Sequence, residues 1–345
     1  MIIKFFLNQC SYLRYFIPLA LQAKALGHEP HFYIKPSGKH NDIFRSGNFE
    51  PFINLCQKNN FSVFKMEDGK SLIGISFFIE GNFAEQCHPG DKKISIITNS
   101  CYNTPTILPN GQKGPTMYET YIDKVDHVIF PGRIFAERYG SISDKNIYIG
   151  SPKYDVKIDK DSVYEKYNLQ KDQKYALFLY PKLRDAERVN IVKIHDSLRS
   201  MGYKIIVKTR AKDSVVDPKR RGDEYFEDVP PKVSWCPYTT VELMKISEIA
   251  INFGSTAITE CAYSRIPVLN FDIKPRLLFD FLYEYDFVHQ FSRGENPTQE
   301  EIVSAVRKLL EKDHSASFDK CYTECLGGDK KDVSNRLLKM LAQPG

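Results

Sequence analysis

The sequence has few of the features that identify metal sites, membrane spans or disulfide scaffolds. Its 345 residues include eight cysteines but no CxxC pair, and its eight histidines form neither an HExxH nor an HxH motif. Neither a cysteine-based nor a histidine-based zinc site is therefore expected. Scattered thiols are typical of a protein in a reduced compartment. No stretch reaches the roughly 18 apolar residues that a membrane span requires.

Signatures of other functional classes are missing as well. The chain contains no Walker A, GxSxG or GxGxxG motif. It has no basic run interleaved with aromatic residues, so nucleic acid is not an expected partner. Met1–Leu7 is too short for a signal peptide, and we expect a cytoplasmic protein, with peripheral contact at the inner membrane face as a further option. The net charge of +5 (48 basic and 43 acidic residues) suits an anionic ligand or an anionic membrane surface.

The sequence does contain apolar runs of strand length that alternate with helical spacing. Apolar residues make up 42% and charged residues 26%, as in globular proteins. Met1–Leu7 and Pro30–Ile34 are predicted strands in the first half, and Tyr175–Tyr180 and Lys204–Lys208 in the second. This alternation predicts an α/β protein with two doubly wound domains, residues 1–155 and 156–330. A helix over 331–345 follows, and its return to the first domain is left open.

The segment Ile249–Phe271 has the strongest functional signal. An apolar run stops at Gly254-Ser255-Thr256, a helical stretch follows, and Val268 opens the next apolar run. We expect a helix that begins on this turn and presents unpaired N–H groups to an anion, typically phosphate. Glu260 is expected about one and a half turns into the helix, placed to accept hydrogen bonds from ribose hydroxyls. Taken alone, the turn is more typical of an ordinary N-cap of a βαβ unit.

Cations follow two other strands of the second half. Lys182 and Arg184 come after the first of these strands, and Lys208 and Arg210 after the next. Because ligands of open α/β sheets bind beyond the carboxyl ends of the strands, these four side chains suit a diphosphate. Solvated loop residues are the alternative interpretation. Tyr238 is a candidate for stacking on a base.

The first half offers fewer candidates, which share positions after strands or in turns. The candidate acceptor-binding residues are Asn8, Ser11, Asn99 and Ser100. His88, in a Cys-His-Pro-Gly turn, and Glu80 are the candidate catalytic bases. A solvated loop histidine is the alternative for His88.

Three parts of the chain resemble GT-B fold glycosyltransferases. The resemblance is to the branch with the CDP-glycerol glycerophosphotransferases, the capsule Kdo transferases and the non-hydrolysing UDP-N-acetylglucosamine 2-epimerases. The similar segments are Asp126–Gly140 with Ile149–Asp155, Ala176–Asp185, and Glu242–Phe271. The resemblance implies two facing Rossmann-like domains with a cleft between them.

The same resemblance implies roles for individual residues. Ser255 and Thr256 would hold the donor phosphate, Glu260 the ribose, and Lys182 and Arg184 would lie near the diphosphate. Two places depart from the family pattern. Asn99-Ser100 stands where a His-Gly is usual, and Lys208-Thr209-Arg210 stands where Lys-Pro-His is often found.

The resulting hypothesis is a glycosyltransferase of polysaccharide biosynthesis that needs neither a metal nor another cofactor. It would move a sugar, or a related polyol phosphate, from a UDP-, CDP- or CMP-linked donor to a cell-surface polysaccharide or a lipid-linked glycan. A nucleotide-sugar 2-epimerase and a non-catalytic nucleotide- or sugar-binding protein of the same fold are the alternatives.

Overall fold

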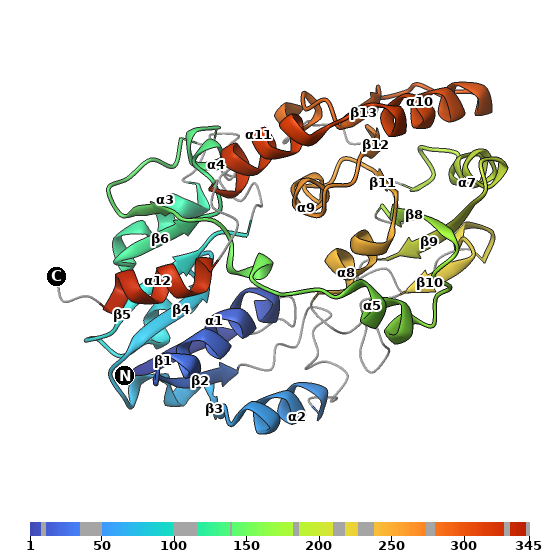
Figure 1. Ribbon diagram of the computed structural model, residues 1–345. Helices are drawn as coiled ribbons and strands as arrows, with labels where there is room; N and C mark the ends of the chain where they lie inside the picture. Colours follow the sequence, from blue (N-terminus) through green and yellow to red (C-terminus); the bar gives the residue numbers. More distant parts are fainter. Residues whose placement is uncertain are drawn as a thin grey trace. The chain divides into compact units, whose positions relative to one another are not determined.

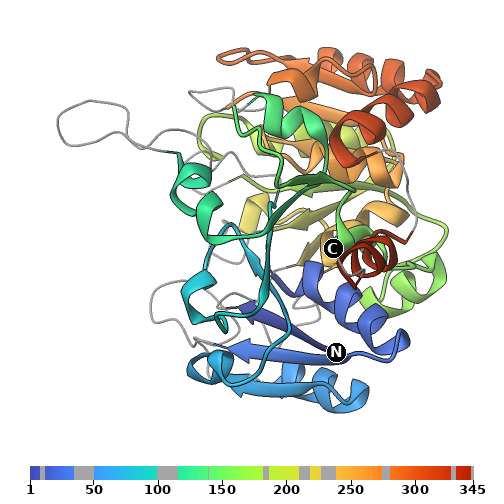
Figure 2. The same ribbon diagram turned by 90° about the vertical axis from the view of Figure 1, so that its left-hand side faces the viewer.

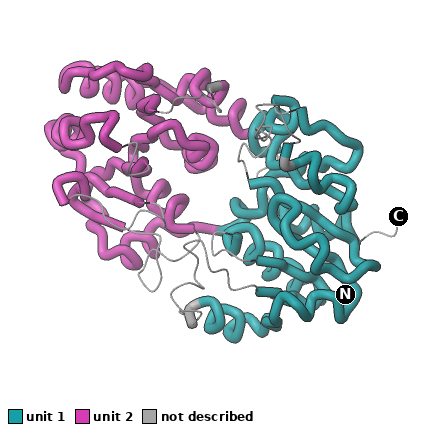
Figure 3. The backbone as a smooth tube through the Cα atoms, turned by 180° about the vertical axis from the view of Figure 1, so that it is seen from behind, with its two compact units in different colours: residues 1–156, 323–345 teal, residues 157–322 magenta. Residues whose placement is uncertain are grey.

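The fold is seen in a computed structural model, and the chain divides into two compact units. Unit 1 comprises Met1–Val156 and Thr323–Gly345, and unit 2 comprises Lys157–Tyr322 (Figure 3). The residues that the structure describes are 1–7, 12–34, 50–98, 116–138, 140–181, 186–209, 218–226, 238–273, 280–327 and 332–342.

Unit 1 is built on a seven-stranded parallel sheet with the strand order β3-β2-β1-β4-β5-β6-β7 (Figure 1). Its strands are β1 Ile2–Leu7, β2 Glu29–Ile34, β3 Ser62–Lys65, β4 Ile75–Ile79, β5 Lys92–Ile96, β6 His127–Phe130 and β7 Asn146–Tyr148. Its α-helices are α1 Leu13–Ala25, α2 Glu50–Asn59, α3 Met117–Tyr121, α4 Arg133–Arg138 and α12 Val333–Ala342.

The C-terminal helix α12 belongs to unit 1 and packs beside α1 (Figure 2). Asp155 holds its first turn, because its two carboxylate oxygens accept hydrogen bonds from Val333 N at 3.0 Å and Ser334 N at 2.6 Å. A carboxylate at this place also suits the partial positive charge of a helix N-terminus. Helix α12 is thereby fixed to Asp155, which lies beside the boundary between units 1 and 2 in the sequence.

Strand β1 is apolar on both faces because helices cover both sides of a parallel sheet. Phe5 stacks on Phe32 and Phe77, with ring centroids 5.1 and 5.6 Å apart. Lys4 is the exception in this strand, and its Nζ lies 2.5 Å from Asp91 Oδ2, with both side chains fully buried. The backbone oxygens of Gly69 and Leu72 accept from the same ammonium group, so the buried charge is satisfied.

Unit 2 has a six-stranded parallel sheet with the order β10-β9-β8-β11-β12-β13. Its strands are β8 Lys174–Leu179, β9 Tyr203–Lys208, β10 Glu224–Phe226, β11 Ile249–Asn252, β12 Val268–Phe271 and β13 Val288–Phe291. Its α-helices are α5 Lys160–Tyr167, α7 Ile191–Ser200, α8 Thr239–Ile246, α9 Ile258–Ser264 and α10 Gln299–Glu311, and α11 Ser315–Leu326 crosses from unit 2 into unit 1.

Alternate residues of β11 and β12 point to opposite faces of this sheet. Ile251, Phe253, Leu269 and Phe271 join the buried cluster that α7 and α10 cover. The intervening Asn252 and Asn270 therefore lie on the other face, and both are fully buried. This alternation places two polar side chains beneath the segment between β11 and α9.

The strands predicted over Met1–Leu7, Pro30–Ile34, Tyr175–Tyr180 and Lys204–Lys208 are confirmed as β1, β2, β8 and β9. The sequence reasoning did not anticipate β10, β13, α3, α5 and α11. A further short strand that the sequence predicts over 233–235 lies outside the described residues. β10 has only three half-buried residues, so its apolar pattern is weak. None of the described helices combines the length and apolar composition that crossing a bilayer needs.

Candidate functional site

Both sheets have the strand order of a dinucleotide-binding fold, with the first and fourth strands of each unit adjacent. In unit 2 these strands are β8 and β11, and the chain leaves them toward opposite sides of the sheet. A crevice forms beyond the carboxyl ends of such a strand pair, and ligands bind there. β11 ends at Asn252, so the Gly254–Thr256 turn follows at this position.

The turn itself differs from the expectation in one respect. Helix α9 begins at Ile258 and has seven residues, so Gly254, Ser255 and Thr256 form a loop before it. Gly254 has φ +63°, a conformation that glycine adopts without strain. Within the described residues, the amides of Ser255 and Thr256 donate no hydrogen bond to the protein. Turn amides, rather than a helix macrodipole, are therefore the groups that can meet an anion here.

Two buried asparagines hold this turn, and the sequence reasoning did not identify them. Asn252 and Asn270 pair in register across β11 and β12. Asn270 Oδ1 accepts from Asn252 Nδ2 at 2.8 Å and from Gly254 N at 3.1 Å. Asn252 Nδ2 also donates to the carbonyl oxygen of Ser255 at 3.2 Å. The start and the middle of the turn are thus tied to the sheet through side-chain amides.

Glu260 lies in the first turn of α9 rather than one and a half turns along it, because the helix starts later than expected. Its side chain is buried, with 9% of its surface exposed, and Thr259 beside it is fully buried. Burial, and then the charge of Glu260, raise the pKa of the Cys261 thiol well above its usual value. A carboxylate this close to the turn can reach a group bound there, whereas the adjacent thiol is inert.

The other candidates of unit 2 fall in two groups. Lys208 is the last residue of β9 and pairs in register with Leu179, the last residue of β8. It therefore lies at the carboxyl edge of the unit 2 sheet, as the Gly254–Thr256 turn does. Tyr238 immediately precedes α8 and is half-buried. Lys182, Arg184 and Arg210 lie outside the described residues. The structure thus places Lys208 at the carboxyl edge with the turn, but it does not describe the cations that the sequence pairs with it.

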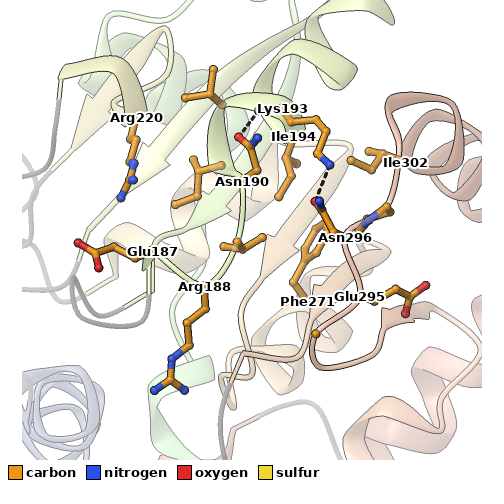
Figure 4. A pocket seen from close by; sticks show the side chains of 15 residues that line it. Glu187, Arg188, Asn190, Lys193, Ile194, Arg220, Phe271, Glu295, Asn296 and Ile302 are labelled. Carbon is orange, nitrogen blue, oxygen red and sulfur yellow. Dashed lines mark hydrogen bonds between the residues drawn. The ribbon is translucent and has the colours of Figure 1, made fainter.

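A pocket of about 420 Å³ opens at the start of α7, on the face of the sheet that α7 and α10 cover (Figure 4). Phe271, Ile194 and Ile302, all buried, form its apolar part. Arg188, Lys193 and Arg220 line it together with the acidic Glu187 and Glu295, and Lys193 reaches across to Asn296, with 2.6 Å between Nζ and Oδ1. Since β12 ends at Phe271, this pocket adds cations near the carboxyl edge, a feature that no sequence motif indicated.

In unit 1, Glu80 lies at the switch point of the sheet, which corresponds to the position of the Gly254–Thr256 turn in unit 2. It directly follows β4, which pairs with β1 at the point where the strand order reverses. Its φ is +53°, unusual for a residue with a side chain, and its carboxyl group is buried. Thr98 donates a hydrogen bond of 2.5 Å from Oγ1 to Glu80 Oε1, and Ser95 Oγ accepts from Gly81 N at 2.9 Å. A buried carboxylate on a strained backbone at a switch point is a strong candidate for a general base.

The structure does not bring His88 and Glu80 together. The backbone N–H of His88 donates to Asp91 Oδ2 at 2.9 Å, and Asp91 Oδ1 accepts from Gly74 N, which precedes β4. His88 therefore lies at the amino edge of the unit 1 sheet, whereas Glu80 lies at the carboxyl edge. Of the two proposed bases, only Glu80 is where an open α/β sheet binds ligands.

The candidate acceptor residues Asn8, Ser11, Asn99 and Ser100 lie outside the described residues. Among the residues that are described, no three histidine, cysteine, aspartate or glutamate side chains gather in a way that could hold a metal ion.

Comparison with known proteins agrees with this architecture. No protein-family model matches the chain, and no curated protein matches it in sequence. Solved structures do match. The wall teichoic acid polymerase TagF has a TM-score of 0.63 at 16% identity, over 99% of this chain and 88% of that one. One TagF structure was soaked with CDPG.

Two further structures show the same likeness. A Listeria monocytogenes protein described as a UDP-N-acetylglucosamine 2-epimerase has a TM-score of 0.57 at 10% identity, over 99% of this chain and 95% of that one. S. aureus MnaA, in a structure with UDP, has a TM-score of 0.54 at 11% identity, with the same coverage. The chain therefore has the GT-B fold, and the predicted fold class and the resemblance are confirmed.

Proposed function

We propose that the protein is a glycosyltransferase that uses a nucleotide-activated donor. The GT-B fold and its nucleotide-containing neighbours support a sugar-nucleotide enzyme in general. The observation that carries the proposal is the Gly254–Thr256 turn at the switch point of unit 2, with the buried carboxylate of Glu260 one helical turn away. Turn amides would bind the donor phosphate and Glu260 the ribose hydroxyls.

Charge near this edge favours a diphosphate. Lys208, Arg188 and Lys193 bring positive charge to the carboxyl side of the unit 2 sheet. Such groups stabilise the charge that develops on the departing nucleotide, which is a nucleoside diphosphate when a sugar leaves an NDP-linked donor and a nucleoside monophosphate when a polyol phosphate is transferred. The proposed reaction accordingly needs no metal ion.

In unit 1, Glu80 would accept the proton of the attacking acceptor hydroxyl. Its buried position, and the hydrogen bond from Thr98 that fixes one carboxylate oxygen, orient the other oxygen for this role. The acceptor would be a cell-surface polysaccharide or a lipid-linked glycan, and the transferred group a sugar or a polyol phosphate.

A thermal-shift screen of CMP, CDP, UDP, GDP and ADP tests the donor site. Binding to the folded state at 100 times the Kd stabilises by about 2.7 kcal/mol, so a true ligand raises the melting temperature clearly. We expect one base to be preferred, and among the cytidine nucleotides we expect CDP to stabilise more than CMP. A protein that none of the five nucleotides stabilises would contradict the proposal.

A 2-epimerase is the second candidate, because two of the similar structures come from that group or contain its nucleotide. An epimerase turns over UDP-N-acetylglucosamine without any acceptor, whereas a transferase needs one. Incubation with this donor alone, followed by product analysis, separates the two. Tight nucleotide binding without turnover under either condition would instead indicate a binding protein.

A further inference from the structure

The corner that follows β4 in unit 1 is strained over more than one residue. Glu80, Gly81 and Phe83 all have a positive φ, of +53°, +73° and +75°. Glycine adopts this left-handed conformation freely, whereas glutamate and phenylalanine rarely do. Such a backbone persists only where the surrounding structure holds it. Two buried side chains, Ser95 and Tyr121, contact this corner.

Ser95 holds the corner from the neighbouring strand. It lies in β5, paired in register with Phe78 of β4, and is fully buried. The backbone N–H of Glu80 continues the strand pairing and donates to Ile96 O at 3.1 Å. The N–H of Gly81 donates instead to a side chain, Ser95 Oγ, at 2.9 Å. This hydrogen bond depends on the left-handed turn, because the turn directs the Gly81 amide at the serine.

The ring of Tyr121 packs directly on the same corner. A Cβ at Gly81 would overlap this ring, so the ring and the glycine backbone are in contact. Tyr121 is the last residue of α3, and only 5% of it is exposed. The helix is fixed in place by Tyr118, whose hydroxyl donates to Asn146 Oδ1 at 2.7 Å. The ring therefore leaves the corner little room to relax on that side.

Tyr121 is not itself an alternative base. Its hydroxyl is buried and has no hydrogen-bond partner among the residues that the structure describes. Burial, and to a smaller degree the charge of Glu80, raise the pKa of this phenol above its usual value. The phenol therefore stays neutral near pH 7 and a hydroxyl group cannot pass it a proton. What Tyr121 contributes to the corner is its ring.

We propose that Ser95 and Tyr121 are positioning residues that hold Glu80 in its left-handed conformation and so aim its carboxylate at the attacking hydroxyl. This inference rests on the proposed function, in which Glu80 is the general base. A base acts only within hydrogen-bond reach of the proton that it removes, and a misplacement of about 1 Å can cost a factor of about 10² in rate. A relaxed corner thus slows turnover although the carboxylate is still present.

Two substitutions test the two contacts. Ser95→Ala removes the acceptor of the Gly81 amide, and Tyr121→Leu removes the ring. Each should lower kcat about tenfold and change the KM for the donor by less than about twofold, because donor binding in unit 2 is untouched. Tyr121→Phe keeps the ring and should rescue turnover. The rate measured is nucleotide release from the donor that the thermal-shift screen selects, with water in place of the glycan.

The matched control is Ser76→Ala. Ser76 is also a fully buried serine, in β4, and its hydroxyl donates to Asp91 Oδ2 at 2.6 Å near the amino edge of the sheet. This variant loses a buried hydrogen bond away from Glu80, so it should lose stability and keep kcat. In a Glu80→Gln background, Ser95→Ala should cause no further loss, because it acts through the carboxylate.

The outcomes separate this inference from the proposed function. If Glu80→Gln is slow while Ser95→Ala and Tyr121→Leu keep the kcat of the parent, Glu80 remains the base and the positioning role is overturned. If Glu80→Gln turns over like the parent, the assigned base is wrong and the inference fails with it. Crystal structures of the two variants need no substrate, and we expect a negative φ at Glu80. A left-handed Glu80 in both would also overturn the inference.

Discussion

The side-chain amides of Asn252 and Asn270 are locked in one orientation by each other and by the backbone. Asn270 Oδ1 accepts from both Asn252 Nδ2 and Gly254 N. Turning the Asn270 amide over would place its NH₂ group against these two donors, so the observed orientation is required. Asn252 Oδ1 and Asn270 Nδ2 are consequently left without a partner in the protein. These two unpartnered groups offset part of the stabilisation that the pair's hydrogen bonds give to the turn.

Replacing Asn270 tests this arrangement. Asn270→Leu removes the acceptor of two buried N–H groups, and we expect a loss of about 2 kcal/mol in the free energy of unfolding. Asn270→Asp keeps the acceptor oxygen and should hold the turn better. Urea denaturation measures both, and nucleotide titration should show weaker binding for the leucine variant. An Asn270→Leu protein with unchanged stability and binding would show that the turn does not depend on this side chain.

Glu260→Gln tests the proposed contact with ribose. A neutral amide is a poorer acceptor than a carboxylate, so the affinity for the preferred nucleoside diphosphate should fall about tenfold. The 2′,3′-dideoxy analogue of the same nucleotide is the matched probe, because it lacks the hydroxyl groups concerned. Calorimetric titration should find that the substitution hardly changes the affinity for the analogue. An equal loss for both nucleotides would exclude a ribose-specific role.

Glu80→Gln and His88→Gln separate the two candidate bases. Removing a general base typically slows turnover by a factor of about 10² to 10⁴, and we expect this loss for Glu80→Gln. His88→Gln, at the opposite edge of the unit 1 sheet, should retain turnover near that of the parent. Steady-state rates with the donor and acceptor that the screens identify provide the measurement. The reverse pattern would assign the base to His88.

The glycine after Glu80 gives a structural test of the same site. A Cβ at Gly81 would lie 2.1 Å from the nearest atom of the Tyr121 ring, and the residue has φ +73°. Gly140 also has a positive φ, of +63°, but a Cβ there meets no atom within 4 Å. Gly81→Ala should therefore cost clearly more than the roughly 1 kcal/mol of backbone strain expected for Gly140→Ala. Thermal or urea unfolding of the two variants decides the comparison.

Stability should fall on acidification because of His195. The residue belongs to α7 and is fully buried, neither ring nitrogen has a hydrogen-bond partner, and burial, with the charge of Arg199 as a smaller cause, lowers its pKa to about 4. The unfolded chain then binds the proton more readily, so stability is complete above about pH 6.5 and is lost as the pH falls toward 4. The shift corresponds to roughly 3 kcal/mol.

The variant His195→Leu isolates this contribution. Urea unfolding of parent and variant is compared between about pH 7 and pH 4.5, and the variant should lose less stability over that range. The other histidines are present in both proteins, so their effects cancel in the difference. Identical pH dependence in the two proteins would show that His195 is not protonated on unfolding.

The sequence alone determined most of the central strands and the helices between them, because apolar runs and helical spacing act over a few residues. It also located the candidate donor-binding turn at Gly254, since an abrupt end of an apolar run by glycine and hydroxyl residues is a local signal. The short strand β10 and the charged helix α5 were missed because their local patterns are weak.

Only the tertiary structure decided which of these residues act together. Asn252 and Asn270 meet because β11 and β12 pair in a particular register, a relationship between separate segments that neither asparagine reveals by itself. Glu80 and His88 are near in sequence, yet the chain turns back between β4 and β5 and carries them to opposite edges. Local chemistry is encoded residue by residue, whereas the grouping of side chains into sites depends on long-range strand pairing.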